Sequence, residues 1–141
     1  MKKKLLLFSL LILYTGLTGG FSQNKPAAPK PRVEVYYFHP TERCPIDQSI
    51  EENTIKLMNG SFAKEIKDGS IKFQIINTDD KSQSKTVARF DINAQGLFVV
   101  KLSNDKEIKN DLTRFAFDYG QSNPDRFRSG LKVEIENTLK K

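Results

Sequence analysis

The residues with chemical potential gather in one short segment, FHPTERCPID, at positions 38–47. It holds Cys44 and His39, the only cysteine and the only histidine of the 141-residue chain. Pro45 suits the first position of a helix, which predicts Cys44 at or beside the helix N-cap, where free backbone N–H groups and the helix dipole stabilise a thiolate. Cys44 is therefore the candidate nucleophilic thiol, and a single cysteine forms no internal disulfide.

Three neighbours could act on that thiol. Asp47 could accept backbone hydrogen bonds in the first helical turn, and its negative charge would oppose the thiolate. Arg43 could offset this carboxylate and stabilise the thiolate. His39, five positions before Cys44, is either a proton carrier for the thiol or a loop histidine that faces solvent.

Other kinds of site find little support. One cysteine, one histidine and scattered acids give no metal-ligand spacing such as C-x-x-C or H-E-x-x-H, and there is no Gly-rich phosphate loop. We therefore expect no metal and no cofactor. Four aromatic residues near the C-terminus have a spacing that suits core packing better than a ligand box: Phe115, Phe117, Tyr119 and Phe127.

The N-terminus has the pattern of a secretory signal. Three lysines precede an apolar run, Leu5 to Tyr14, that is too short to span a bilayer, and small residues at Gly20 and Ser22 suit a cleavage site. We predict a signal peptide over 1–22, with an uncleaved membrane anchor as the alternative. The mature protein would then be soluble in the periplasm or outside the cell, with no stable membrane insertion.

The sequence predicts that the rest of the chain is a linker followed by one domain. Residues 23–32 contain three prolines among small and basic residues, which predicts an extended linker, and residues 33–141 suffice for one core. Loss of the three signal-peptide lysines lowers the net charge from +6 to +3. Because the basic residues are interleaved with acids, we expect no nucleic-acid partner.

Hydrophobic patterning predicts alternating strands and helices in this domain. The expected strands are Val33–Phe38, Ile71–Ile75 and a hairpin of 97–102 with 106–111, turning at Asn104–Asp105. The first expected helix begins at Pro45 and stops at Asn59–Gly60. Three shorter helical segments are expected at Ser61–Lys67, within Asp79–Phe90 and at Leu112–Tyr119. The last expected helix begins at Pro124 and places Phe127, Leu131, Ile135 and Leu139 on one face. The order β-α-β-α-β-β-α predicts an α/β fold whose mixed four-stranded sheet is flanked by helices, with the first two strands parallel and the last two antiparallel.

This order, with a cysteine at the start of the first helix, resembles the thioredoxin-like superfamily. The local sequence is similar to its C-x-x-C motif with the second cysteine replaced by Asp47. Since the second thiol resolves mixed disulfides, dithiol oxidoreductase turnover within one chain is excluded. The resemblance also implies a peptide-binding cis-proline before the third strand, where this chain has Gln95 and Gly96. We expect these two residues to lie at the binding face.

Within that superfamily the chain resembles a group of short exported proteins called nitrophenyl-compound nitroreductase subunits. Members of this group have the sequence R-C-x-x-C at the site. Arg43 and Cys44 match this motif, whereas Asp47 stands where the motif has its second cysteine. The name implies an accessory subunit, but no motif here would bind flavin or nicotinamide. The similarity rests on VEVYYFH (33–39), ERC (42–44), IEENT (50–54), LFV (97–99) and NDLTRFAFDYGQSNPDRF (110–127).

Two functions stay open at this point. The first is a non-catalytic or accessory binding module of the cell envelope, which the absence of both the second thiol and the cis-proline favours. The second is a monothiol redox protein that forms mixed disulfides through Cys44. Its partner would be an envelope protein or a small thiol.

Overall fold

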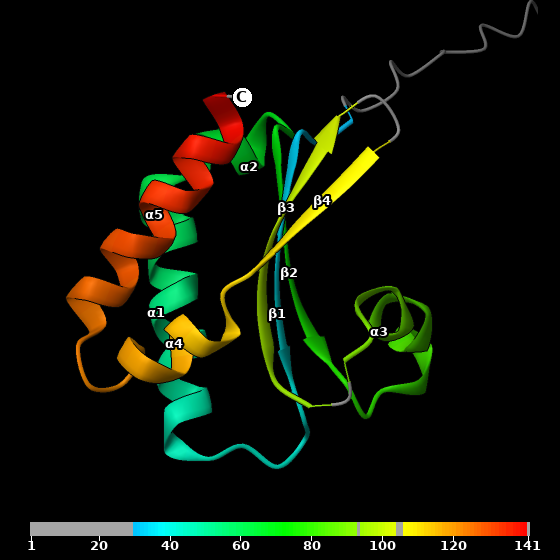
Figure 1. The fold of residues 1–141 in the computed structure, drawn as a ribbon, viewed down its shortest axis with the longest axis vertical. Helices are drawn as coiled ribbons and strands as arrows, with labels where there is room; N and C mark the ends of the chain where they lie inside the picture. The colour runs from blue at the N-terminus through cyan, green and yellow to red at the C-terminus, as the bar shows by residue number, and fades with distance from the viewer. Residues whose placement is uncertain (1–29, 93, 104–105, 141) are drawn as a thin grey trace, which may run out of the picture.

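The computed structural model describes residues 30–92, 94–103 and 106–140, which form an α/β fold around one mixed sheet (Figure 1). The sheet has the order β2-β1-β3-β4. β1 runs parallel to β2, whereas β1 and β3, and β3 and β4, are antiparallel. The predicted mixed four-stranded sheet and its pairing directions are therefore confirmed. The strands are β1 (Val33–His39), β2 (Ile71–Asn77), β3 (Gly96–Ser103) and β4 (Lys106–Asp111).

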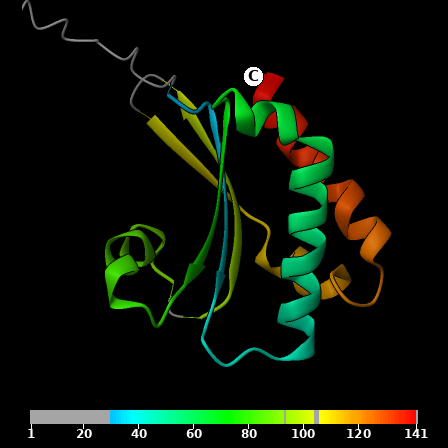
Figure 2. The ribbon, with the colours of Figure 1, turned by 180° about the vertical axis from the view of Figure 1, so that it is seen from behind.

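Helices cover both faces of this sheet unequally. α1, α4 and α5 lie on one face, and the short α3 lies on the other (Figures 1 and 2). The helices are α1 (Pro45–Ser61), α2 (Ala63–Lys67), α3 (Ser84–Phe90), α4 (Thr113–Tyr119) and α5 (Pro124–Lys140), with a 3₁₀ turn at Lys81–Gln83.

The larger core lies between the sheet and the layer of α1 and α5. Val35 and Tyr37 of β1 point into it, as period-two alternation requires. Phe127, Leu131 and Ile135 of α5 are all completely buried there, and Leu139 is partly buried. The four-residue spacing therefore marked the core face of this helix correctly.

A smaller aromatic cluster fills the opposite face, under α3. Tyr36, Phe38 and Phe98 from the sheet meet Phe90 of α3, with ring centroids 4.8–5.9 Å apart. Burial, followed by the nearby charge of Glu34, raises the pKa of Tyr36 to about 12. The cluster thus keeps its one phenol protonated.

Arg89 ties α3 to the sheet through charge. Its guanidinium donates to Glu34 at 2.8 Å and to Tyr36 at 2.9 Å, and it also pairs with Glu107 of β4. Glu34 is only 6% exposed. Since a buried carboxylate is costly without a partner, Arg89 is needed for this face to close.

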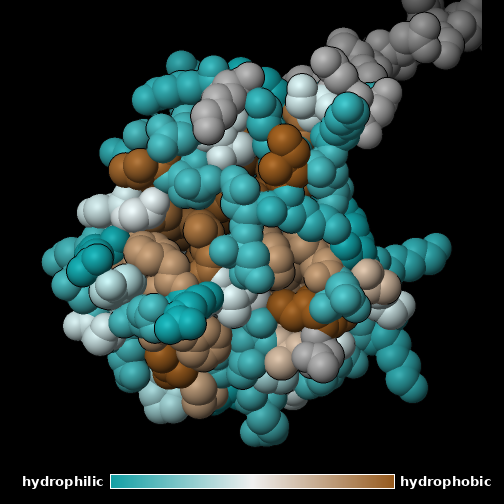
Figure 3. All heavy atoms as spheres, in the orientation of Figure 1, coloured by the Kyte–Doolittle hydropathy of each residue, from teal (hydrophilic) through white to brown (hydrophobic). Residues whose placement is uncertain are grey.

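A hollow lies between α5 and β4. On the face shown in Figure 3, hydrophobic residues gather between the helices and the sheet. Ile108 of β4, which is 55% exposed, lines this hollow together with Asn110 and with Glu134 of α5. Asn110 donates to Glu134 at 2.7 Å, so a polar contact bridges the hollow.

Two local predictions need correction, and one is confirmed. The short helix predicted within Asp79–Phe90 is α3, which begins at Ser84 after a 3₁₀ turn and packs Val87 and Phe90 into the aromatic cluster. α1 does not stop at Asn59–Gly60 but continues to Ser61, because the Phe62 N–H still bonds to the Met58 carbonyl and the Phe62 side chain reaches the core at 3% exposure. His39 belongs to β1 rather than to the loop after it.

Some expectations concern residues outside the described ranges. These are the signal peptide 1–22, residues 23–29 of the linker and the turn Asn104–Asp105. Among the residues that the structure does describe, no helix has both the length and the apolar character needed to cross a membrane.

Candidate functional site

Cys44 lies at the N-cap of α1, where the sequence predicted it. Its backbone is extended, with φ −80° and ψ 167°, and Pro45 occupies the first helical position. The Gln48 N–H bonds to the Cys44 carbonyl and starts the helix. The thiol-bearing residue is exposed and ends the segment that leads from β1 into α1, a connection that can be followed in Figure 1.

Asp47 is the buried centre of this site, at 1% exposure. Its Oδ2 accepts the Cys44 backbone N–H at 3.1 Å, the Cys44 thiol at 3.1 Å and the Gln95 side-chain amide at 3.3 Å. The first of these bonds is one half of a capping box. The residue in place of a second cysteine is therefore built into the helix start, and it accepts the hydrogen of the Cys44 thiol.

The other carboxylate oxygen of Asp47 is different. Oδ1 is buried and has no hydrogen-bond partner among the described residues. A buried acceptor left without a donor costs about 1–3 kcal/mol. The site thus holds an unused acceptor immediately beside an exposed thiol.

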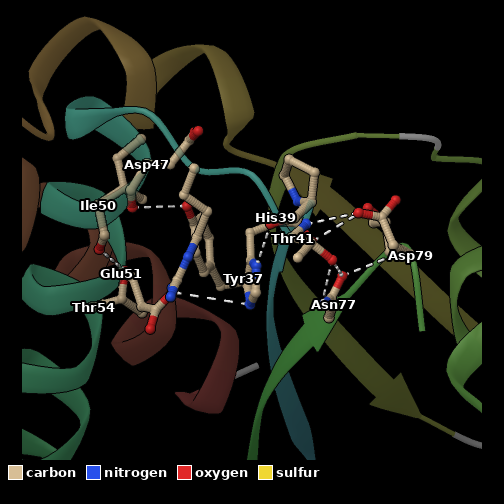
Figure 4. Close-up of polar contacts among 12 residues, drawn as sticks. Tyr37, His39, Thr41, Asp47, Ile50, Glu51, Thr54, Asn77 and Asp79 are labelled. Atoms are coloured by element: carbon tan, nitrogen blue, oxygen red, sulfur yellow. Dashed lines mark hydrogen bonds and ion pairs between the residues drawn. The ribbon is translucent and has the colours of Figure 1, made fainter.

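Tyr37 of β1 fixes the turn that carries these groups. Its hydroxyl donates to the Asp47 backbone carbonyl at 2.9 Å (Figure 4). Burial, followed by the charge of the Asp47 side chain, raises the pKa of Tyr37. The phenol therefore stays protonated and remains a donor, which holds the first turn of α1 against the end of β1.

Gln95 and Gly96 reach the same place from the loop before β3. Gln95 donates to Asp47, as described, and Gly96 pairs with Phe38 of β1. A Cβ on Gly96 would lie 2.2 Å from Ile92 Cδ1 and 2.7 Å from Phe98 Cε2. The missing side chain therefore makes room for side chains of the same chain, and Gln95 is the residue of this pair that joins the site. The described peptide bonds are all trans.

Arg43 and His39 face a different acid, Glu51. The Arg43 guanidinium forms an ion pair with the Glu51 carboxylate, and His39 Nε2 lies 4.0 Å from the same oxygen (Figure 4). The Glu51 hydrogen bond raises the pKa of Arg43. His39 is 12% exposed in its side chain, and its Nδ1 lies 2.8 Å from the Pro40 carbonyl. The histidine is therefore not a solvent-facing loop residue.

Sequence reasoning missed Glu51, although a signal was present. Glu51 lies four residues after Asp47 and so occupies the same face of α1, one turn further on. Within the part of the chain that the structure describes, the side chains of Arg43 and His39 make their polar contacts with Glu51 and Pro40. The six predicted residues thus separate into a Cys44–Asp47–Gln95 group, an Arg43–His39 group and Gly96.

A further polar contact secures the loop between β1 and Cys44. The Thr41 backbone N–H donates to Asp79 at 2.7 Å, and Asn77 bonds to the Thr41 hydroxyl at 3.1 Å (Figure 4). The Thr41 backbone hydrogen bond lowers the pKa of Asp79. The loop is therefore anchored at the end of β2 on one side and by Tyr37 on the other.

We searched the described residues for a metal site and the sequence for known relatives. In residues 30–92, 94–103 and 106–140, no three His, Cys, Asp or Glu side chains are placed to share a metal ion. No protein-family model and no curated protein matches the sequence.

Proposed function

We propose that this chain is an exported thioredoxin-like protein whose site binds a partner in the cell envelope without turning over disulfides. Support for the thioredoxin-like part comes from the strand directions, with β1 and β2 parallel and β3 and β4 antiparallel, and from the cysteine at the N-cap of the helix after β1. Support for export is the N-terminal sequence alone.

The observation that carries the binding role is the set of bonds on Asp47 Oδ2. One oxygen accepts both the backbone N–H and the thiol of Cys44. The thiol donates its hydrogen to this carboxylate oxygen, so it is held in a contact within the chain instead of being presented to a disulfide. No second thiol is present to release a mixed disulfide. Both steps of dithiol turnover are therefore disfavoured by the same residue.

The unused oxygen of Asp47 indicates what a partner would supply. Oδ1 is buried and has no hydrogen-bond donor among the described residues, while Cys44 beside it is exposed. A partner N–H or O–H group that reached Oδ1 would recover the free energy of the missing hydrogen bond. We therefore place the contact surface at Cys44, Asp47 and Gln95.

A monothiol redox role is the second candidate, and the exposure of Cys44 favours it. The thiol lies at the N-terminus of a 17-residue helix, where the helix dipole stabilises negative charge. In this role Cys44 would give its proton to solvent, attack a disulfide R–S–S–R and form Cys44–S–S–R with release of one thiolate. A second thiol molecule would then restore Cys44 and carry R away as a new disulfide.

Capture from envelope extracts separates the two roles. The bait proteins are the wild type, Cys44→Ser and Asp47→Asn, each with and without reductant. Non-covalent binding at Asp47 predicts that one partner is retained by Cys44→Ser and under reductant but is weakened by Asp47→Asn, which replaces an acceptor with an amide. Loss of the partner with Cys44→Ser and with reductant would instead assign the thiol-linked role.

Alkylation of Cys44 provides an independent readout. The rate of reaction with iodoacetamide is measured from pH 6 to 9 for the wild type and for Asp47→Asn. We expect the variant to react several-fold faster near neutral pH, because an amide oxygen accepts the thiol hydrogen bond more weakly than a carboxylate does. Equal rates in the two proteins would contradict the assigned effect of the carboxylate.

A further inference from the structure

A second polar site lies in the helix layer, in a notch between α1 and α5. Its volume is about 290 Å³, and its lining combines three cations, two hydroxyls and one apolar side chain: Lys56, Arg128, Lys132, Ser61, Ser129 and Leu57. The lining contains no acid. Lys56 is twelve residues beyond Cys44 on α1, roughly 18 Å along the helix axis, so the notch is separate from the Asp47 site.

Arg128 is held in place by residues outside the notch lining. Its guanidinium donates to the Asn53 side-chain oxygen on α1 and to Asp125 on α5. Asn53 is itself fixed, since its amide donates to the Ser49 carbonyl at 2.8 Å. A guanidinium carries five N–H donors, and these two bonds leave others free. Arg128 therefore offers oriented donors at little additional entropic cost.

The two lysines add charge that neighbouring acids neutralise only in part. Lys132 lies 3.8 Å from Glu136, and both side chains are more than 40% exposed. Asp125, the acid on Arg128, is 90% exposed in its side chain. Three cations against these two acids leave one net positive charge at the notch. Among the described residues Lys56 has no acid within ion-pair distance, so the notch keeps an excess of positive charge.

We propose that this notch binds a phosphate group. A tetrahedral oxyanion presents several acceptor oxygens at once, and a fixed guanidinium fork with two flanking ammonium groups supplies matching charged donors. The hydroxyls of Ser61 and Ser129 add neutral donors from the same lining. Leu57, 6% exposed, limits the water on one side and strengthens these contacts. The phosphate could be free in solution or part of an anionic lipid headgroup.

The test uses the mature chain labelled with ¹⁵N and a charge-matched pair of variants. The notch variant is Lys56→Gln with Lys132→Gln, and Arg128 is left intact because it also holds Asn53. The control is Lys81→Gln with Lys85→Gln, which removes the same charge from the 3₁₀ turn and α3 on the opposite face of the sheet. Circular dichroism and amide spectra establish that both variants are folded.

Each protein is titrated at constant ionic strength with inorganic phosphate and with vesicles containing phosphatidylglycerol in phosphatidylcholine. We expect saturable shifts at notch amides for the wild type and the control, and affinity about tenfold or more weaker for the notch variant, which loses two charged donors. Binding of either ligand at the notch supports the proposal. Binding of only one of them identifies whether the phosphate comes from solution or from a lipid headgroup. Absence of both, or an equal loss in the control, overturns the proposal.

Discussion

Replacing Asp47 by cysteine should create a disulfide that the wild-type chain cannot form. The side chains of residues 44 and 47 already meet, since the Cys44 sulfur lies 3.1 Å from Asp47 Oδ2. The two positions are one helical turn apart and share a face of α1. Cysteines at such a separation are close enough to bridge. We expect the Asp47→Cys variant to oxidise in air.

The free energy of unfolding of the Asp47→Cys variant should differ between its reduced and oxidised states. The reduced variant loses the carboxylate that accepts the Cys44 N–H, and loss of such a cap costs about 1 kcal/mol, up to 2. Closing a four-residue loop restricts the unfolded chain and returns about 2 kcal/mol in the chain-entropy treatment. The oxidised variant should therefore unfold within about 1 kcal/mol of the wild type, whereas the reduced variant should be less stable by about 1–2 kcal/mol.

Thiol counting under native and denaturing conditions, with urea unfolding in the presence and absence of dithiothreitol, measures these differences. The variant should also gain disulfide reductase activity with dithiothreitol, and the wild type should show almost none. Asp47→Ser is the matched control, since it loses the carboxylate without adding a thiol and should be insensitive to reductant. An Asp47→Cys protein that keeps two free thiols after air oxidation would refute the site geometry and the redox ancestry inferred from it.

Four other outcomes follow from the fold. Gly96→Ala should lower the free energy of unfolding in urea by about 1–3 kcal/mol, because the added methyl group overpacks its surroundings. Gly60→Ala, whose Cβ meets nothing within 4 Å, should raise it by about 0.5–1 kcal/mol. Equal effects of the two substitutions would contradict the packing described. Arg89→Gln removes the closest charged partner of the buried Glu34 carboxylate, which keeps the Tyr36 hydroxyl at 3.1 Å and Lys72 at 3.9 Å. It should cost about 2–3 kcal/mol, and a loss below about 0.5 kcal/mol, typical of a surface pair, would show that Glu34 does not depend on Arg89. Because the pKa of Tyr36 rises from 10.0 to about 12 on folding, its contribution to stability is full below pH 10 and disappears by about pH 12. The free energy of unfolding should therefore fall less steeply between these pH values for Tyr36→Phe than for the wild type. An unchanged pH profile would count against this linkage. N-terminal sequencing of native protein should begin near Gln23, and recovery of the lysine cluster would exclude cleavage.

Elements with a strong local pattern were predictable from the sequence, and those that depend on packing were not. The β-branched and aromatic run at Val33 marked the central strand, and the four-residue spacing from Phe127 marked α5, because each pattern matches the period of its element. The stop expected at Asn59–Gly60 rested on local preference alone. Burial of Phe62 outweighed that preference and carried α1 further.

The same distinction holds at the site. Cys44 could be placed at the helix N-cap because Pro45 follows it, which is a signal between adjacent residues. The partner of Gln95 could not be predicted, since it contacts Asp47 across 48 positions of sequence through the path of a loop. Glu51 was only partly predictable. Its four-residue spacing from Asp47 places it on the same face of α1, but its ion pair with Arg43 depends on how the loop turns into the helix, which this spacing does not describe.

The two edges of the sheet differ in how well they resist unwanted strand pairing. β4 carries alternating charges over most of its length, KEIKND, whereas β2, IKFQIIN, has a single charged residue, Lys72, and pairs only with β1. Charged side chains discourage intermolecular sheet extension, and apolar edge strands invite it. At the high local concentrations of overexpression or freezing, β2 is therefore where aggregation would begin. Lys72 is the charged residue that protects this edge, and a solubilising substitution at Gln74 would protect the protein more than any change on β4.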